Sequence, residues 1–331
     1  MKTIITFLIS ILVLTQVVND DKKVKRSEML DKVFMTLEEN IANPDWLTDK
    51  SFLDFKALLY SDSILSLNDQ EFQKTFDQAR WNLPFTHFQI LKTKASSSLP
   101  KNKTEHDNDP SVTWEAIDEK TAFLRIRTFS IPGKKIARAL QEIGTDNYEN
   151  LIIDLRDNGG GNLEGPIALG RFLTQKPIDA GYYLTRKWFK NNKDLPTSED
   201  VQQMPFLQDF SYAGIKKMFA NEAAFRMVIP GHENTVYKGK VYVLINKWTA
   251  SACEPLIDIF KKNKIATLVG ETSCGGMLSG SYFDINEDYK AFIPIADYYT
   301  AHGQKIDKIG VKPDIEINPE NAKEYIIKLI K

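Results

Sequence analysis

A serine, a run of three glycines and a few histidines and carboxylates are the residues of this chain that could do chemistry. Ser251 lies in the small-residue segment Thr249-Ala-Ser-Ala252, between an apolar β-branched run at 241–245 and apolar residues at helical spacing from 256 to 260. This pattern predicts a buried strand, a turn that presents Ser251, and a helix. Because amides at a helix start are unpaired and the helix dipole favours negative charge there, the turn is a suitable place for a nucleophile.

A structural role is the alternative for Ser251. It could cap the helix, with Glu254 completing a Ser-x-x-Glu capping box. Pro255 argues against this role, because a proline at that point of the helix would clash with the carbonyl group of residue 251. We therefore expect the helix to start at Ala252 or later and to leave the Ser251 hydroxyl available.

The glycine run lies in Asp154-Leu-Arg-Asp-Asn-Gly-Gly-Gly161, directly after a second buried strand at 151–155. Glycine has no Cβ, so its amide can approach a reacting carbonyl group closely; a tight turn between strand and helix is the alternative. The run lacks the lysine that a phosphate-binding loop needs, and no His, Cys and Asp spacing fits zinc. We expect neither a metal nor a cofactor.

Strands and helices alternate around these segments, which predicts an α/β core over residues 112–331. We expect a hairpin at 112–117 and 121–126, helices at 136–143 and 167–173, and later strands at 266–269, 281–285, 291–294 and 314–317. A mostly helical, aromatic-rich insertion at 187–236 has the size of a lid. Residues 21–95 predict an N-terminal helical subdomain, in which a charged tether at 21–31 leads into the first helix, and 96–111 predict a polar linker.

The composition and the first residues limit the partners and the location that we expect for the protein. The 331 residues include 43 basic and 44 acidic ones, so charge does not favour nucleic acid or an anionic membrane as partner. Met1-Lys2 followed by the apolar stretch 3–18 predicts a signal peptide or N-terminal anchor within residues 1–20, with cleavage near 18–21. We expect an exported protein, periplasmic or extracellular, with a tether to the membrane if the segment stays uncleaved, and no other membrane span.

Four ordered motifs together resemble the C-terminal processing peptidases, or tail-specific proteases. The motifs are Asp154-Leu-Arg-Asp-Asn-Gly-Gly-Gly161, Thr249-Ala-Ser-Ala-Cys-Glu254, Val269-Gly-Glu-Thr-Ser-Cys-Gly-Gly276 and Gly310-Val-Lys-Pro-Asp314. The resemblance implies a crotonase- and ClpP-like β-α spiral core and a serine endopeptidase that acts on peptides or proteins. It places the nucleophile on Ser251, one oxyanion-hole amide on Gly159 or Gly160 and the other on Ala252, with Arg156 in support.

The base is where this chain departs from the bacterial members of the family. They carry a lysine in the segment after Val-Gly-Glu, and here that position is Gly276, while Lys261, Lys262 and Lys264 come too early in the chain. The tricorn-like branch, which includes the retinoid-binding relatives, instead implies a histidine after a small hydroxyl residue and an acid before Gly-Val-x-Pro-Asp. Thr86-His87 and Asp307 occupy these places, with Asp for the usual Glu. His302 is a competitor as base, whereas His106 and His232 are expected on the surface.

Two further expectations concern substrate entry and the thiols. Most family members carry a PDZ domain before the core, and the residues between Leu91 and Val112 are too few for one, so the predicted lid would decide what enters. Cys253 and Cys274 are expected close together, as a disulfide or as two thiols in an apolar core. A non-catalytic module that holds an apolar ligand or peptide is the alternative function, and the oligomeric state is open.

Overall fold

The computed structural model describes residues 2–93, 111–234 and 236–331. The chain forms two compact units, of which the first comprises Met1–Lys101 with Gly280–Ile295 and the second comprises Asn102–Ser279 with Ala296–Lys331. The predicted polar linker, apart from Ser111, and His106 within it lie outside the described residues.

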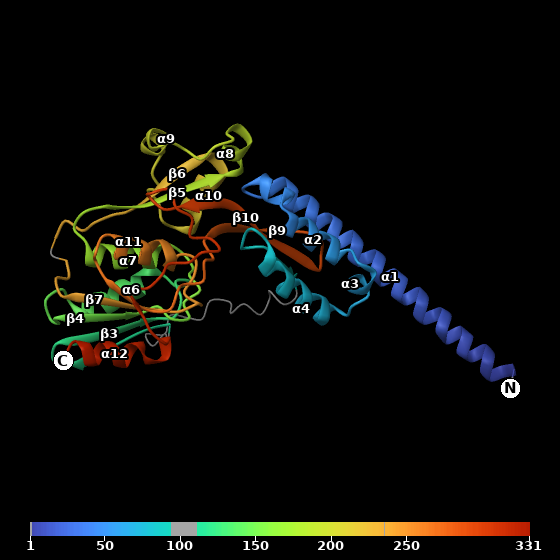
Figure 1. Cartoon of the computed structure of the whole chain (residues 1–331), viewed down its shortest axis with the longest axis horizontal. Helices are drawn as coiled ribbons and strands as arrows, with labels where there is room; N and C mark the ends of the chain where they lie inside the picture. The colour runs from blue at the N-terminus through green and yellow to red at the C-terminus, as the bar shows by residue number, and fades with distance from the viewer. Residues whose placement is uncertain (1, 94–110, 235) are drawn as a thin grey trace. The chain divides into compact units, whose positions relative to one another are not determined.

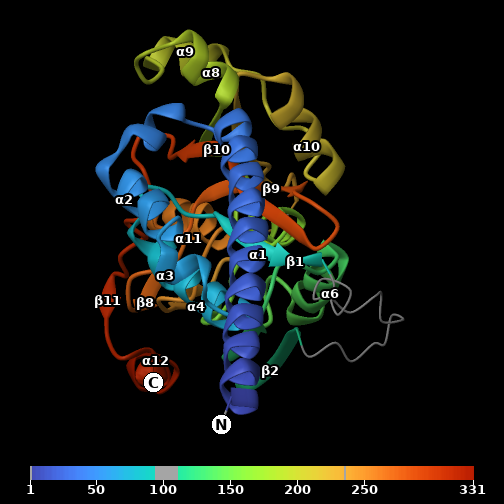
Figure 2. The same ribbon diagram turned by 90° about the vertical axis from the view of Figure 1, so that its right-hand side faces the viewer.

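The first unit is mainly helical. Its elements are α1 (Lys2–Asn40), η1 (Pro44–Thr48), α2 (Lys50–Leu59), α3 (Asp62–Leu65), α4 (Asp69–Ala79), η2 (Arg80–Asn82) and β1 (Gln89–Lys92). Figures 1 and 2 show α2 and α3 beside α1. Asn68 and Glu71 form a capping box that starts α4, and Asp49 caps α2. A buried aromatic core of Phe34, Phe52, Phe55, Phe76, Phe85 and Phe88 holds these helices together.

The charged residues at 21–31 belong to α1, so the prediction of a tether there is wrong. The reason is tertiary: Arg26 is 6% exposed, donates to the carbonyl oxygen of Leu65 (2.9 Å) and pairs with Asp69 (2.8 Å). Burial of one face makes this polar stretch part of the helix. In the part of the chain that the structure describes, no helix has the length and apolarity needed to cross a membrane.

A mostly parallel sheet is the framework of the second unit. Its order is β11-β8-β7-β4-β3-β2, built from β2 (Val112–Asp118), β3 (Thr121–Ile126), β4 (Asn150–Asp154), β7 (Lys240–Ile245), β8 (Thr267–Gly270) and β11 (Ile315–Glu316). In this sheet the predicted hairpin β2–β3 is antiparallel, whereas β3, β4, β7, β8 and β11 run parallel to one another. The ends of parallel strands meet at one edge, which brings the turns after β4 and β7 together.

Helices cover both faces of this sheet (Figure 1). Val243 and Ile245 of β7 pack in a core with α6 (Gly133–Ile143), α7 (Glu164–Leu173) and α11 (Cys253–Lys262). The alternate residues Tyr242 and Leu244 pack against Ala322 and Ile326 of α12 (Ala322–Leu329). Strands buried on both faces read as continuous apolar runs, which is why 241–245 and 151–155 could be recognised.

The second unit also contains antiparallel strands. β5 (Ile178–Thr185) pairs with β6 (Ala224–Ile229) and with residues 296–299 of β10 (Tyr289–Tyr299). Earlier residues of β10 and most of β9 (Leu278–Asp284) belong to the first unit, where β10 pairs with β1; sequence analysis placed both strands in the core. Pairing with β1 is the reason for the difference.

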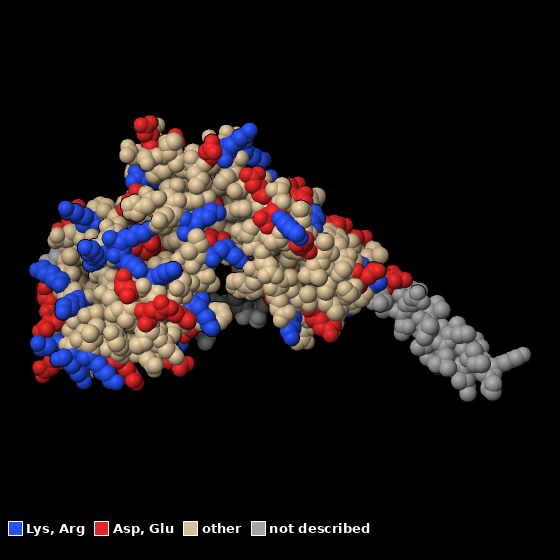
Figure 3. Space-filling view, in the orientation of Figure 1, with Lys and Arg blue, Asp and Glu red and all other residues tan. Residues whose placement is uncertain are grey.

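The predicted insertion at 187–236 contains α8 (Arg186–Asn191), α9 (Ser198–Gln203) and α10 (Tyr212–Asn221), and also β6. Basic and acidic side chains are intermixed on the visible face of the described residues, in keeping with the balanced charge (Figure 3). The predicted α/β class, with a helical N-terminal part, is confirmed.

Candidate active site

Ser251 lies in the turn between β7 and α11. The helix begins at Cys253, Ala252 occupies its N-cap position and makes no side-chain capping bond, so the prediction that Ser251 Oγ does not cap the helix is confirmed. Ser251 has φ 55°, a left-handed conformation that only a few per cent of non-glycine residues adopt. The turn therefore holds the partly buried Ser251 in a backbone conformation that is rare for a non-glycine residue.

The glycine run passes directly beside Ser251. A Cβ on Gly160, whose φ is 90°, would lie 2.7 Å from Ser251 Cβ and 2.9 Å from the amide nitrogen of Ala252. On its other side the run is fixed to Phe129, whose amide donates to the carbonyl oxygen of Gly160 (2.9 Å). Gly160 thus has room for no side chain, and its backbone forms one wall of the site.

Two amides at this wall are free to bind a developing negative charge. The Gly160 amide is engaged, since it donates to Asn158 Oδ1 (2.9 Å). The amides of Gly159 and Ala252 have no hydrogen-bond partner within the described parts of the chain. A Cβ added to Gly159 would meet no neighbouring atom within 4 Å, so the space beside this residue is open. Of the two glycines predicted as donors, Gly159 therefore has the available N–H group.

Polar residues that sequence analysis did not single out join the two turns. Asn246 Nδ2 donates to Asp157 Oδ1 (2.8 Å), and the Asp157 amide donates back to Asn246 Oδ1 (3.0 Å). Thr249 Oγ1 donates to the carbonyl oxygen of Leu155 (2.9 Å), and the Ala250 amide donates to that of Asn158 (3.0 Å). Asn158 and Thr249 are fully buried, so these bonds are shielded from water and fix the glycine run against Ser251.

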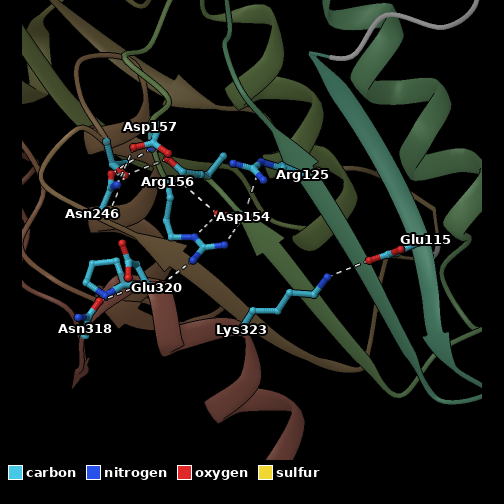
Figure 4. A network of polar contacts seen from close by, with 12 residues as sticks. Glu115, Arg125, Asp154, Arg156, Asp157, Asn246, Asn318, Glu320 and Lys323 are labelled. Atoms are coloured by element: carbon cyan, nitrogen blue, oxygen red, sulfur yellow. Dashed lines mark hydrogen bonds and ion pairs between the residues drawn. The ribbon is translucent and has the colours of Figure 1, made fainter.

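Arg156, predicted as a supporting residue, stabilises the turn that leads into the glycine run. It forms a two-point ion pair with the fully buried Asp154 (2.8 and 2.7 Å; Figure 4). It also donates to the carbonyl oxygen of Pro319. The pairing with Asp154 raises the pKa of Arg156. The same network lines a cavity of about 780 Å³ with Arg125 and Trp248, and Ser251 is not part of its lining.

Glu254 is the buried acid nearest to Ser251 in the chain, and its side chain joins two segments. It is 0% exposed, and its Oε2 accepts from the amides of Ser251 (3.1 Å) and Gly276 (2.9 Å). Its Oε1 accepts from Ser273 Oγ (2.6 Å) and the Gly275 amide (2.7 Å). Burial raises the pKa of Glu254 to about 7, and these four hydrogen bonds oppose the rise. The bond from the Ser251 amide is half of the capping box considered from the sequence.

Asp307, the predicted acid, is 5% exposed and accepts from the Met277 amide through Oδ1 (2.9 Å). Its segment is tied to the 273–276 loop, because the Lys308 amide donates to the carbonyl oxygen of Gly275 (2.7 Å) and the Val311 amide to Ser273 Oγ (2.7 Å). Glu254 and Asp307 are thus attached to the same loop, in which Gly276 stands at the position where the resemblance would place a lysine.

The predicted base, His87, lies in the first unit. Its Nδ1 is 2.8 Å from Thr86 Oγ1, its ring packs 5.9 Å from that of Phe292, and its φ is 60°. Burial, with a contribution from Arg80, lowers the pKa of His87 to about 4, which keeps the imidazole neutral near pH 7. Since Ser251 belongs to the second unit, the pairing of His87 with Ser251 and Asp307 stays a prediction.

The competing bases lie in other settings. His302 is exposed in a turn, and His232 is exposed with Nδ1 bound by the Asn234 amide (3.0 Å). Lys261 and Lys262 are in the last turn of α11, roughly 13 Å along the helix from Ala252. Lys261 Nζ donates to the carbonyl oxygen of Lys312 (2.8 Å), and Lys262 pairs with Asp258 (3.1 Å). Among the described residues no His, Cys, Asp or Glu cluster could hold a metal ion.

Both cysteines are free thiols, so the predicted alternative of a disulfide is not realised. Cys253 is buried and its Sγ is 3.4 Å from the carbonyl oxygen of Asn158, while the Cys274 amide donates to the carbonyl oxygen of Thr249 (2.9 Å). Burial raises the pKa of both thiols, and the Glu254 charge adds to the rise. Neither thiol is therefore activated as a nucleophile at neutral pH.

Comparison with known proteins finds a family match for the chain. Residues 120–317, more than half of the chain, match the family described as peptidase family S41. This stretch contains every motif on which the resemblance to tail-specific proteases was based, and that resemblance is confirmed.

Curated relatives and a solved structure agree with the family match. The chloroplastic C-terminal processing peptidase of Tetradesmus obliquus is 26% identical over 207 residues, which are 62% of this chain and 37% of the relative. The carboxyl-terminal-processing protease of a Synechocystis species is 27% identical over 197 residues, 59% of this chain and 38% of the relative. The matches thus span about two fifths of the length of these relatives. The solved photosystem II D1 C-terminal processing protease shares the fold, with a TM-score of 0.54, 14% identity and coverage of 89% of this chain and 94% of that one.

Proposed function

Because this chain belongs to peptidase family S41, we propose that it is an exported serine endopeptidase that hydrolyses peptide bonds through an acyl-enzyme on Ser251. One observation carries the proposal. Ser251, in a left-handed turn, lies against Gly160, beside the unpaired amides of Gly159 and Ala252. A nucleophile beside two free backbone donors is what acyl transfer requires.

In the proposed mechanism Ser251 Oγ attacks the carbonyl carbon of the scissile peptide bond. His87 accepts the hydroxyl proton and passes it to the leaving amine, and Asp307 orients the imidazole and stabilises its cation. The oxyanion binds the amides of Gly159 and Ala252. A water molecule, activated by His87, then hydrolyses the ester on Ser251.

Reaction with a fluorophosphonate probe tests this function. The wild-type protein should be labelled and Ser251→Ala should not, while Ser63→Ala, a change at an exposed serine of α3, should label like wild type. Cleavage of an unfolded protein substrate, followed by mass spectrometry, should be lost in the same variant. An unlabelled wild-type protein that binds peptides without cleaving them would establish the binding module instead.

The base is tested by a matched pair of histidine variants. His87→Ala should lose most of the labelling rate, because an unassisted serine hydroxyl is a weak nucleophile. His302→Ala, a change in an exposed turn, should keep it. The reverse result would move the base to His302.

Export rests on the apolar stretch 3–18 after Lys2. Residues 1–30 fused to alkaline phosphatase, which folds only in an oxidising compartment, should give active phosphatase in a bacterial host. Residues 21–30 fused in the same way should not. Equal activity of the two fusions would contradict export by this segment.

A further inference from the structure

Four hydrogen-bond donors surround the Glu254 side chain, and an ionised carboxylate has about four lone-pair sites to receive them. Each oxygen accepts two of the donors, at 2.6 and 2.7 Å on Oε1 and at 2.9 and 3.1 Å on Oε2. The side chain is 0% exposed, so water cannot replace a lost partner. The site therefore accommodates the charged form of Glu254 without a spare acceptor or an unmet donor.

The donors come from two places in the chain. One is the Ser251 amide, and three belong to Ser273, Gly275 and Gly276 in the loop after β8. Ser273 extends the connection, since its Oγ also accepts from the Val311 amide (2.7 Å). The turn that presents the nucleophile and the segment that carries Asp307 are thus joined through one carboxylate.

We propose that Glu254 is a positioning residue whose ionised carboxylate holds Ser251 in its reactive geometry, so that protonation of Glu254 switches the nucleophile turn off. The inference rests on the proposed function, since it concerns the rate at which Ser251 reacts. A proton on either oxygen replaces a lone pair by an O–H donor, which then faces one of four N–H or O–H donors. At least one of these bonds is lost, and the left-handed turn loses part of its support.

The groups around Glu254 do not supply a compensating cation in the described part of the second unit. Cys253 on its own helix and Cys274 in the loop both have their pKa raised, in part by the Glu254 charge, which places both as neutral thiols beside it. Asp307 and Lys308, on the segment after β10, act on Cys274 with opposite sign. The burial that raises the pKa of Glu254 to about 7 places the transition in the neutral range.

The test measures the rate of fluorophosphonate labelling of the full chain from pH 5 to 9. Wild-type labelling should fall as the pH drops through about 7. Glu254→Gln should label at least tenfold more slowly at pH 8 and should lack this transition, because an amide brings a donor at every pH. Asp258→Asn, a change of another buried carboxyl group on α11, should keep both the rate and the transition.

The variant Ser273→Ala gives a more specific test, because it should shift the pH of the labelling transition. Loss of one donor to the carboxylate should raise the pH of the transition by about one to two units, because a hydrogen bond to a charged group favours the ionised form by roughly ten- to a hundredfold and each factor of ten is one pKa unit. This variant also decides the matter if Glu254→Gln fails to fold, as judged by circular dichroism. An unchanged transition in Ser273→Ala, or a transition near pH 7 that persists in Glu254→Gln, overturns the inference. Absence of labelling in the wild-type protein at every pH refutes the proposed function instead.

Discussion

Gly160→Ala should damage both the stability of the second unit and the reactivity of Ser251. The new Cβ would lie within 2.9 Å of three atoms of the nucleophile turn, and it would be forced into a backbone conformation with φ 90°. Left-handed strain costs about 1–3 kcal/mol, and overpacking a site enclosed by backbone atoms adds about 1–3 kcal/mol. The sum, about 2–6 kcal/mol, corresponds to a lower Tm by roughly 4–24 °C for a unit of this size.

Displacement of the turn should also misplace the Ala252 amide. Loss of one oxyanion donor lowers such rates by about 10²- to 10³-fold, so fluorophosphonate labelling should fall by about two orders of magnitude. Gly303→Ala is the matched control, because φ there is 73° and the nearest atom to a new Cβ is Tyr182 Oη at 3.6 Å. It isolates the backbone strain from the crowding.

The two glycine variants together test whether Gly160 is needed for the close approach of the glycine run to Ser251. Gly303→Ala should lose about 1–3 kcal/mol and label at the wild-type rate. If Gly160→Ala melts at the same temperature as Gly303→Ala and labels like wild type, close approach of the glycine run to Ser251 is not what Gly160 provides.

Further predictions concern the supports of the site. Thr249→Val should lower the free energy of unfolding by about 1–3 kcal/mol in urea titrations, because it removes one of two donors from the buried carbonyl group of Leu155 and leaves the amide of Asn246 without its partner; an unchanged midpoint would contradict the proposed link between the turns. Asp307→Asn should slow peptide hydrolysis less than Ser251→Ala and His87→Ala, which should lose nearly the same factor because such residues act as a unit. Lys262→Ala and Lys264→Ala should stay near wild type, and loss of hydrolysis in either would restore an amine base. The lowered pKa of His87, about 4 in the folded chain against 6.5 unfolded, means that the unfolded chain binds more protons in this window. Stability should therefore be present above pH 6.5 and be lost as the pH falls toward 4, and His87→Gln should remove that slope in urea titrations at pH 5 and 7.

The main elements of the fold could be predicted because burial leaves a local pattern. Apolar runs at 151–155 and 241–245 and the helical spacing after Ser251 correspond to β4, β7 and α11. The helical state of residues 21–31 could not be predicted, since it depends on Arg26 reaching the carbonyl oxygen of Leu65 at the end of α3. β6 was missed inside a stretch of mostly helical composition, because its pairing with β5 comes from distant residues.

The residues of the candidate site could likewise be predicted only in part. The motifs led to Ser251, Ala252 and the glycine run, which the structure brings together. The role of Glu254 was not foreseen, although its place in a Ser-x-x-Glu pattern was noted. Its partners are mostly backbone amides and a hydroxyl group of a loop after β8, and no side-chain pattern encodes them. Asn158, directly before the glycines, offered the one local signal for a buried turn-forming residue.

The left-handed backbone of Ser251 has a consequence for how such a protein evolves. A residue with φ 55° is held there against its own preference, so selection for activity and selection for stability oppose each other at this position. Glycine at position 251 would relieve the backbone and abolish the hydroxyl group at once. If the proposed peptidase activity were no longer under selection, this serine would be expected to be lost early, with a gain in stability.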